Sequence, residues 1–75
     1  MMMEWRIRVE TYSGYKAEEY PVRFWIGEKR LEVLEIEDRW YSPGFSYFKV
    51  FADDAAHYIL KKSSDTDIWS VNDLP

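Results

Sequence analysis

Apolar and polar residues alternate with a period of two along most of the 75-residue chain, and turn residues interrupt this alternation at short intervals. The first alternating segment, residues 5–10, carries Trp5, Ile7 and Val9 between charged neighbours. This period places the two sets of side chains on opposite faces of a β-strand, so each segment predicts a half-buried strand. Further strands are predicted over residues 21–26, 30–41, 45–52, 56–61 and 68–71. Residues 15–19 are polar and suit a loop or a short helical turn.

The third segment, residues 30–41, changes the parity of its apolar residues between Val33 and Leu34. Helical spacing would account for part of this pattern. The β-branched residues Val33 and Ile36 and the hairpin signal at Gly27 favour a strand instead. A β-bulge inserts one extra residue into a strand and thereby moves the following side chains to the other face. We therefore predict one long strand with a bulge.

Six consecutive short strands with short turns predict an antiparallel meander within a single all-β domain that spans residues 1–75. The clearest turn is Ser42-Pro43-Gly44, because Pro at the second position and Gly at the third suit a type II turn. Five or six such strands curl into a small barrel, so an SH3-like barrel is expected, with an open curled sheet as the alternative. The predicted core consists of Phe24, Ile36, Trp40, Phe48, Val50 and Leu60.

The chain contains no cysteine, which excludes disulfides and thiolate zinc sites as stabilising devices. A domain this small buries only about 60 % of the surface that its unfolded chain exposes. Four Trp, six Tyr and four Phe residues offer large buried areas per residue. Burial of these rings, or association with a second copy of the chain, is expected to supply the missing stability.

The formal net charge is −4, and this acidic balance argues against general binding to nucleic acid or to anionic membranes. The first residues show no basic, signal-like start, and no apolar run approaches the roughly 18 residues of a membrane span. A cytoplasmic location without membrane contact is therefore expected.

The sequence offers little from which to build a catalytic centre. His57 is the single histidine, and without a nucleophile and an orienting group it is expected to be an ordinary strand residue. Acidic pairs near the turns are explained by turn chemistry. Asp65, Asp67 and Asp73 lack the central glycine and the terminal glutamate of an EF-hand. We therefore expect no enzyme, no metal site and no cofactor.

Exposed aromatic residues give the clearest signal of an interaction. Two tyrosines and a lysine flank Gly14 in a predicted loop, where they either face a partner or fold back over the barrel mouth. Alternation places further rings on strand faces opposite the predicted core. Such rings are enriched at binding hot spots. We predict a patch that docks a protein or peptide partner, composed of Tyr12, Tyr15, Lys16, Trp25, Arg39, Tyr41 and Tyr47.

Six runs carry a family resemblance: Glu10-Thr11-Tyr12-Ser13-Gly14-Tyr15-Lys16-Ala17, Pro21 to Phe24, Glu32-Val33-Leu34-Glu35-Ile36, Asp38-Arg39-Trp40-Tyr41, Tyr47-Phe48-Lys49-Val50 and Ala52-Asp53-Asp54. Over roughly residues 9–71 the chain resembles a group of short bacterial cytosolic β proteins to which no activity is assigned. The stretch Asp38-Arg39-Trp40 is also similar to small β domains associated with bacterial DNA-repair polymerase components. This second resemblance implies an alternative function, an accessory contact with single-stranded nucleic acid through stacked aromatic rings.

Overall fold

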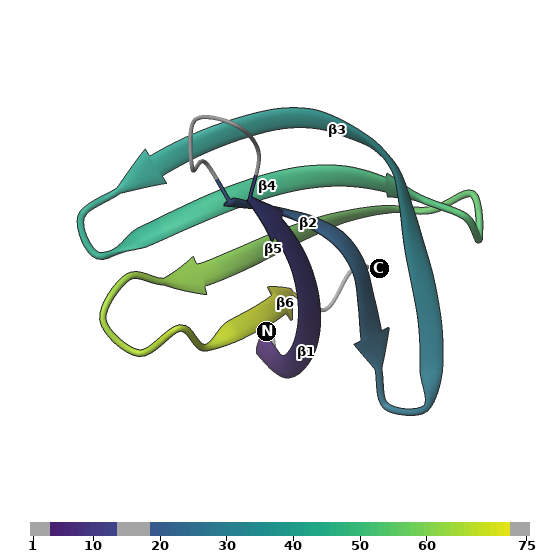
Figure 1. Ribbon diagram of the computed structural model, residues 1–75, viewed down its shortest axis with the longest axis horizontal. Coiled ribbons are helices and arrows are strands. Elements are labelled where there is room, and N and C mark those ends of the chain that lie inside the picture. The colour runs from purple at the N-terminus through teal and green to yellow at the C-terminus, as the bar shows by residue number, and fades with distance from the viewer. Residues whose placement is uncertain (1–3, 14–18, 73–75) are drawn as a thin grey trace.

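The computed structural model describes residues 4–13 and 19–72, and every regular element in these ranges is a β-strand. Consecutive strands pair antiparallel, and the last strand pairs with the first, which closes the sheet into a barrel (Figure 1). The predicted all-β class and the antiparallel meander are confirmed, and the closed barrel is consistent with an SH3-like fold. The strands are β1 (Glu4–Ser13), β2 (Glu19–Ile26), β3 (Lys29–Ser42), β4 (Phe45–Ala52), β5 (His57–Ser63) and β6 (Trp69–Asn72).

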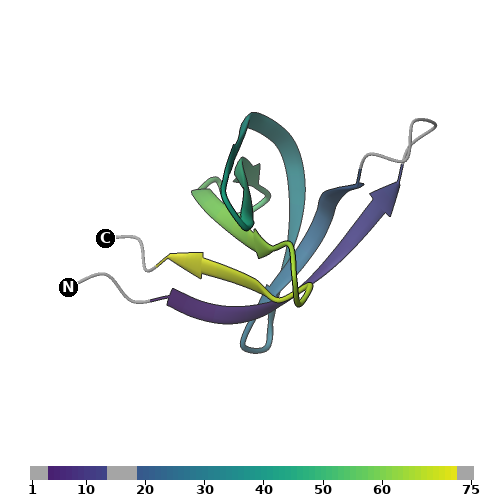
Figure 2. The same ribbon diagram turned by 90° about the vertical axis from the view of Figure 1, so that its left-hand side faces the viewer.

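Two long strands, β1 and β3, each divide their length between two neighbours. Residues 4–7 of β1 pair with β6, whereas residues 8–13 pair with β2. Residues 29–32 of β3 pair with β2, and the rest of that strand pairs with β4. The end of β1 and the beginning of β2, which pair with each other, consequently extend away from β3–β5 as a two-stranded arm (Figure 2). The barrel is closed by strands that bend from one set of partners to another.

The parity change in β3 comes from two β-bulges, where one was predicted. The register shifts once between Val33 and Glu35, and again between Ile36 and Asp38. The first shift places Ile36 opposite the buried Val50. The second shift exchanges the inner and outer positions of β3 once more, so that Trp40 lies opposite Tyr47. Trp40 therefore points outward, with 37 % of its surface exposed, and its prediction as a core residue is wrong.

The barrel interior holds eight buried apolar residues drawn from β2 to β6. Four of the six predicted core residues are among them, and Ile36 packs against the cluster while remaining partly exposed. Aromatic contacts organise the centre, since the rings of Phe48 and Trp69 lie 5.6 Å apart between centroids, and Phe24 meets Tyr58 edge-on at 5.3 Å. The eight buried core residues are Phe24, Leu31, Phe48, Val50, Ala52, Leu60, Trp69 and Val71, and Pro21 of β2 is also fully buried.

Two tight turns fix the register of the hairpins beside the core. Gly27 has a φ of 61° at the first central position of the β2–β3 turn, as a type II′ hairpin requires. Gly44 has a φ of 83° after Pro43, which confirms the predicted type II turn between β3 and β4. Both positions need the left-handed backbone conformation that glycine adopts without strain.

The turn between β4 and β5 is organised by the carboxylate of Asp54. This carboxylate accepts hydrogen bonds from the hydroxyl of Tyr58 at 2.6 Å and from the N–H of Ala56 at 3.1 Å, and Lys29 lies at 3.3 Å. Burial alone would raise the pKa of Asp54, but these hydrogen bonds together hold its pKa below the usual value. Burial, and then the bond to Asp54, raise the pKa of Tyr58 to about 12. Ala55, in the same turn, has a φ of 67°.

Candidate functional site

A single row of side chains crosses the outer face of the barrel over five neighbouring strands. Directly opposed residues of antiparallel strands share a face, so the register alone defines this row. It alternates with the buried positions of β4, β5 and β6 and therefore faces solvent. At about 4.8 Å between strands, it is roughly 19 Å long. From β3 to β1 its members are Trp40, Tyr47, Lys61, Ser70 and Arg6.

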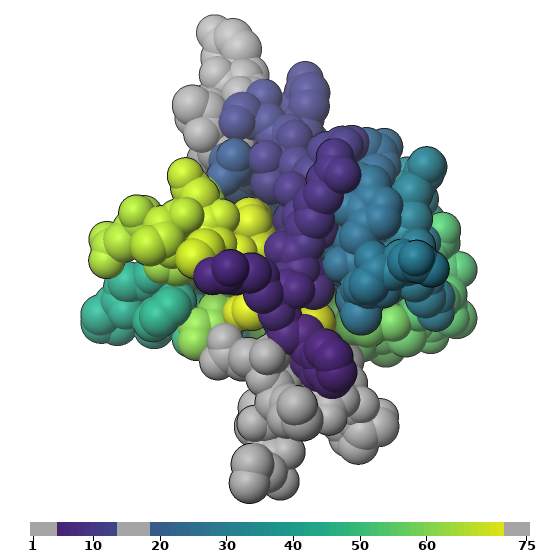
Figure 3. All heavy atoms as spheres, turned by 90° about the horizontal axis from the view of Figure 1, so that it is seen from below, coloured from purple at the N-terminus to yellow at the C-terminus, as the bar shows by residue number. Residues whose placement is uncertain are grey.

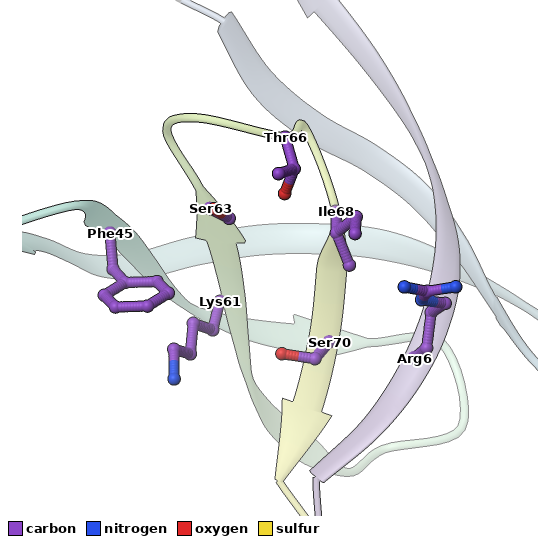
Figure 4. A pocket seen from close by; sticks show the side chains of 7 residues that line it. All are labelled: Arg6, Phe45, Lys61, Ser63, Thr66, Ile68 and Ser70. Carbon is purple, nitrogen blue, oxygen red and sulfur yellow. The ribbon is translucent and has the colours of Figure 1, made fainter.

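A shallow hollow of about 300 Å³ lies along the part of the row formed by β4, β5, β6 and β1. Figure 4 shows Phe45 at one side of it and Arg6 at the other, with the remaining side chains between them. Its lining combines two cations, three hydroxyl groups, one aromatic ring and one aliphatic side chain. The lining residues are Arg6, Phe45, Lys61, Ser63, Thr66, Ile68 and Ser70.

The hollow crosses the seam at which the barrel closes. Arg6 lies on β1 and Ser70 on β6, and the register pairs the two directly. Figure 3 shows β1, in purple, between β6 on one side and β2 on the other. The site is thus built from residues that lie more than half the chain length apart in sequence.

Aromatic rings extend the site from the hollow toward β3. The rings of Trp40 and Tyr47 stack with an interplanar angle of 5° and a centroid separation of 5.4 Å. Tyr47 is also 6.5 Å from Phe45, and the ammonium of Lys61 lies 4.1 Å from the centre of the Phe45 ring. A cation at this distance from an aromatic face is attracted by the ring's quadrupole. The face therefore offers flat apolar surfaces next to positive charge.

Charge is distributed unevenly over this acidic protein. None of the described residues that line the hollow is acidic, although the net charge of the chain is −4. Elsewhere, several carboxylates are held in ion pairs: Arg23 contacts Glu10 and Glu32, and Lys62 contacts Glu19 at 2.5 Å. The hydrogen bond from Lys62 holds the pKa of Glu19 below its usual value. The described lining of the hollow thus carries two cations and no carboxylate, while Asp65 and Asp67 flank Thr66 in the turn beside it.

The residues of the predicted patch do not share one face. Tyr47 belongs to the outer row, but Tyr41 is opposite Ser46, on the reverse side of the β3–β4 hairpin. Arg39 lies on that reverse side too, with its guanidinium 5.0 Å from the centre of the Phe48 ring. Trp25 lies in the other half of the barrel, where the guanidinium of Arg8 covers its ring at 4.6 Å.

Tyr12, the described residue at the loop end of the predicted patch, lies near the end of β1. Tyr12 is 58 % exposed, and its ring meets that of Tyr20 edge-on at 5.7 Å. Tyr15 and Lys16 lie outside the described residues, and so does Asp73. Of the described residues, Tyr12 pairs with Tyr20 across β1 and β2, whereas Tyr47 pairs with Trp40 and Lys61, so the structure does not bring Tyr12 and Tyr47 together through strand pairing.

Sequence reasoning missed most of the outer site. Arg6, Phe45, Lys61 and Ser70 were not singled out as members of one patch, because only the β6–β1 pairing brings them together. Tyr47 was predicted, and the signal that could have added Lys61 to it is that both occupy outward-facing positions of two adjacent predicted strands.

Other polar side chains form local pairs. His57 lies on the surface with its Nδ1 2.6 Å from a carboxylate oxygen of Glu37, beside the ring of Phe51.

Within residues 4–13 and 19–72, no three histidine, aspartate or glutamate side chains are grouped so that they could hold a metal ion. The described part of the chain contains no helix with the length and apolar character needed to cross a membrane.

Comparison of the chain with protein-family models, with curated proteins and with solved structures finds no match in any of the three. The family resemblance noted in the sequence stays a prediction, and the function is argued from the site.

Proposed function

We propose that the protein is a non-catalytic binding module that binds single-stranded nucleic acid along the row from Trp40 to Arg6. The proposal rests mainly on one observation: stacked aromatic rings and a cationic hollow lie side by side on the same outer face. Proteins that bind single strands combine aromatic side chains, on which bases stack, with cations that follow the phosphate backbone.

We expect the two ends of the row to bind different parts of the ligand, a base at one end and phosphates at the other. Trp40 keeps part of its ring accessible, so that a base can stack on it while Tyr47 supports the opposite side. Lys61 and Arg6 lie further along the row, at the distance of one and three strands from Tyr47. They would neutralise phosphates, and the hydroxyl groups of Ser63, Thr66 and Ser70 line the hollow between them.

The acidic net charge bears on how strongly such a site binds. Few cations are available, so affinity is expected to depend on stacking as well as on charge. A ligand that carries negative charge without bases would use the hollow but gain nothing from Trp40. This difference separates nucleic acid from an acidic peptide as the ligand.

Binding of a fluorescein-labelled oligothymidylate of about twelve nucleotides, measured by fluorescence polarisation at low salt, tests the proposal. Trp40→Ala is expected to weaken binding by about 1–3 kcal/mol through loss of stacking. Lys61→Gln should weaken binding and lower the slope of log affinity against log salt by about 0.7–1. Arg30→Gln is the matched control, because Arg30 lies on the β2–β3 hairpin, beside Glu32.

Polyglutamate provides a second control, since it matches the charge of the oligonucleotide and has no rings. Polyglutamate is expected to compete poorly with the oligonucleotide for the site. Absence of binding at low salt, or equal losses in Lys61→Gln and Arg30→Gln, would contradict the proposal.

A further inference from the structure

A second hollow opens where β2 and β3 separate. Their pairing begins at Arg23 opposite Glu32 and continues toward the Gly27 turn. Beyond that point β2 continues along β1, whereas β3 continues along β4. The two strand segments that face each other across the gap, residues 19–22 and 33–36, therefore have a ladder partner on one side only.

The gap is an apolar groove with a volume of about 270 Å³. Pro21 forms part of its wall and is fully buried, while Leu34 stands at its edge with 61 % of its surface exposed. Leu34 is exposed because it occupies the first bulge of β3, where the register shifts between Val33 and Glu35. The lining residues are Tyr20, Pro21, Val22, Val33, Leu34, Glu35 and Ile36.

We infer that this groove binds an extended peptide segment of another protein, with alternating apolar side chains and at least one lysine or arginine. An edge without a ladder partner accepts an added strand through main-chain hydrogen bonds, and pockets along it select alternate side chains. Pro21 has no N–H, so it cannot donate to an added strand from the β2 edge. The apolar lining supplies the pocket for the side chains.

Charge favours a basic peptide over a second copy of this chain. Among the described residues that line the groove, Glu35 alone is charged, with an exposed carboxylate, and the protein carries a net charge of −4. Two copies would bring like charges together at the groove, whereas a lysine or arginine beside Glu35 would be attracted. The occupant is therefore a partner of opposite charge. This site does not overlap the outer row and does not depend on the nucleic-acid proposal.

Selection from a random twelve-residue peptide library displayed on phage, with the full chain immobilised, tests the inference. Peptides with alternating apolar residues and a lysine or arginine should be enriched. For the best synthetic peptide, Leu34→Asp should weaken binding at least about tenfold, which corresponds to about 1.4 kcal/mol, while Leu34→Met changes it little. Leu34 is exposed, so neither variant should prevent folding, and circular dichroism checks this.

The contribution of charge is tested separately with Glu35→Gln, which should weaken binding several-fold. Glu28→Gln is the matched control, because Glu28 is exposed in the β2–β3 turn outside the groove. Lys61→Gln should leave peptide binding unchanged, which separates this result from the test of nucleic-acid binding. The inference is overturned if no peptide is enriched, if Leu34→Asp binds as tightly as the wild type, or if sedimentation shows a dimer that Leu34→Asp dissociates.

Discussion

Replacing Tyr58 by phenylalanine removes one hydroxyl group from the β4–β5 turn and leaves the aromatic packing in place. The ring of Tyr58 still meets Phe24 edge-on, but the 2.6 Å hydrogen bond to Asp54 is lost. Hydrogen bonds to a charged group contribute about 1.5–3 kcal/mol. Because Asp54 keeps the N–H of Ala56 and the ammonium of Lys29, we expect Tyr58→Phe to lower the free energy of unfolding by about 1–2 kcal/mol at neutral pH.

The same hydroxyl makes a specific prediction about alkaline pH. Its pKa is raised from 10.0 to about 12 in the folded protein. A group whose pKa is raised by folding contributes stability that is fully present below the unfolded pKa and disappears as the pH passes the folded pKa. The difference in stability between wild type and Tyr58→Phe should therefore be constant below about pH 9 and shrink between about pH 10 and 12.

The size of this effect follows from the same pKa values. A rise from 10.0 to about 12 corresponds to at most about 2.7 kcal/mol, at about 1.36 kcal/mol per pKa unit. The pair is partly solvated, which screens the interaction and reduces the expected change to about 1–2 kcal/mol. This range agrees with the value expected from the hydrogen bond alone.

Urea unfolding followed by tryptophan fluorescence, at a series of pH values from 7 to about 11.5, measures both quantities. Contributions that the substitution leaves unchanged cancel in the difference between the two proteins. A difference that stays constant up to the highest pH, or one below about 0.5 kcal/mol at neutral pH, would refute the assignment of this hydroxyl to Asp54.

Three further substitutions test the packing and the turns, and each is measured as a change in the free energy of unfolding. Phe48→Ala should cost about 3–5 kcal/mol, since Phe48 is buried against Trp69, and a change below about 1 kcal/mol would show that it lies outside the core. Trp40→Ala should cost less than half as much as Phe48→Ala, because Trp40 is partly exposed. A loss equal to that of Phe48→Ala would show that Trp40 is buried in the core. Ala55→Gly should stabilise the protein by about 0.5–1 kcal/mol, because alanine is strained at a φ of 67°, and destabilisation would contradict that reason.

The strands could be predicted from the sequence because their signals are local. Alternation located all six, and the Pro43–Gly44 pair fixed one turn and its type. The interior was predicted less completely. Leu31 is buried but was not among the predicted core residues. Trp69 and Val71 lie in a strand of only four residues, too short for alternation to reveal its inner face.

The position of Trp40 shows why part of the site escaped prediction. One bulge was expected in β3, and with one bulge Trp40 would share the inner face with Ile36. The second bulge, between Ile36 and Asp38, turns it outward beside Tyr47. Bulges depend on how two strands fit each other, so the sequence of one strand does not count them. The neighbourhood of Arg6 and Ser70 likewise depends on a pairing between the two ends of the barrel.

That pairing has a consequence for how the protein assembles. The contacts between β1 and β6 join residues 4–7 to residues 69–72, the largest sequence separation in the barrel, so closing the loop between them costs more conformational entropy than closing any of the hairpins. The hairpins from β2 to β5 connect strands that are adjacent in sequence, but without the pairing of β1 with β6 the hollow is incomplete. Only the fully closed chain offers Arg6 beside Ser70 to a ligand. A ligand that contacts both Arg6 and Ser70 would hold the first and last strands together and slow their separation.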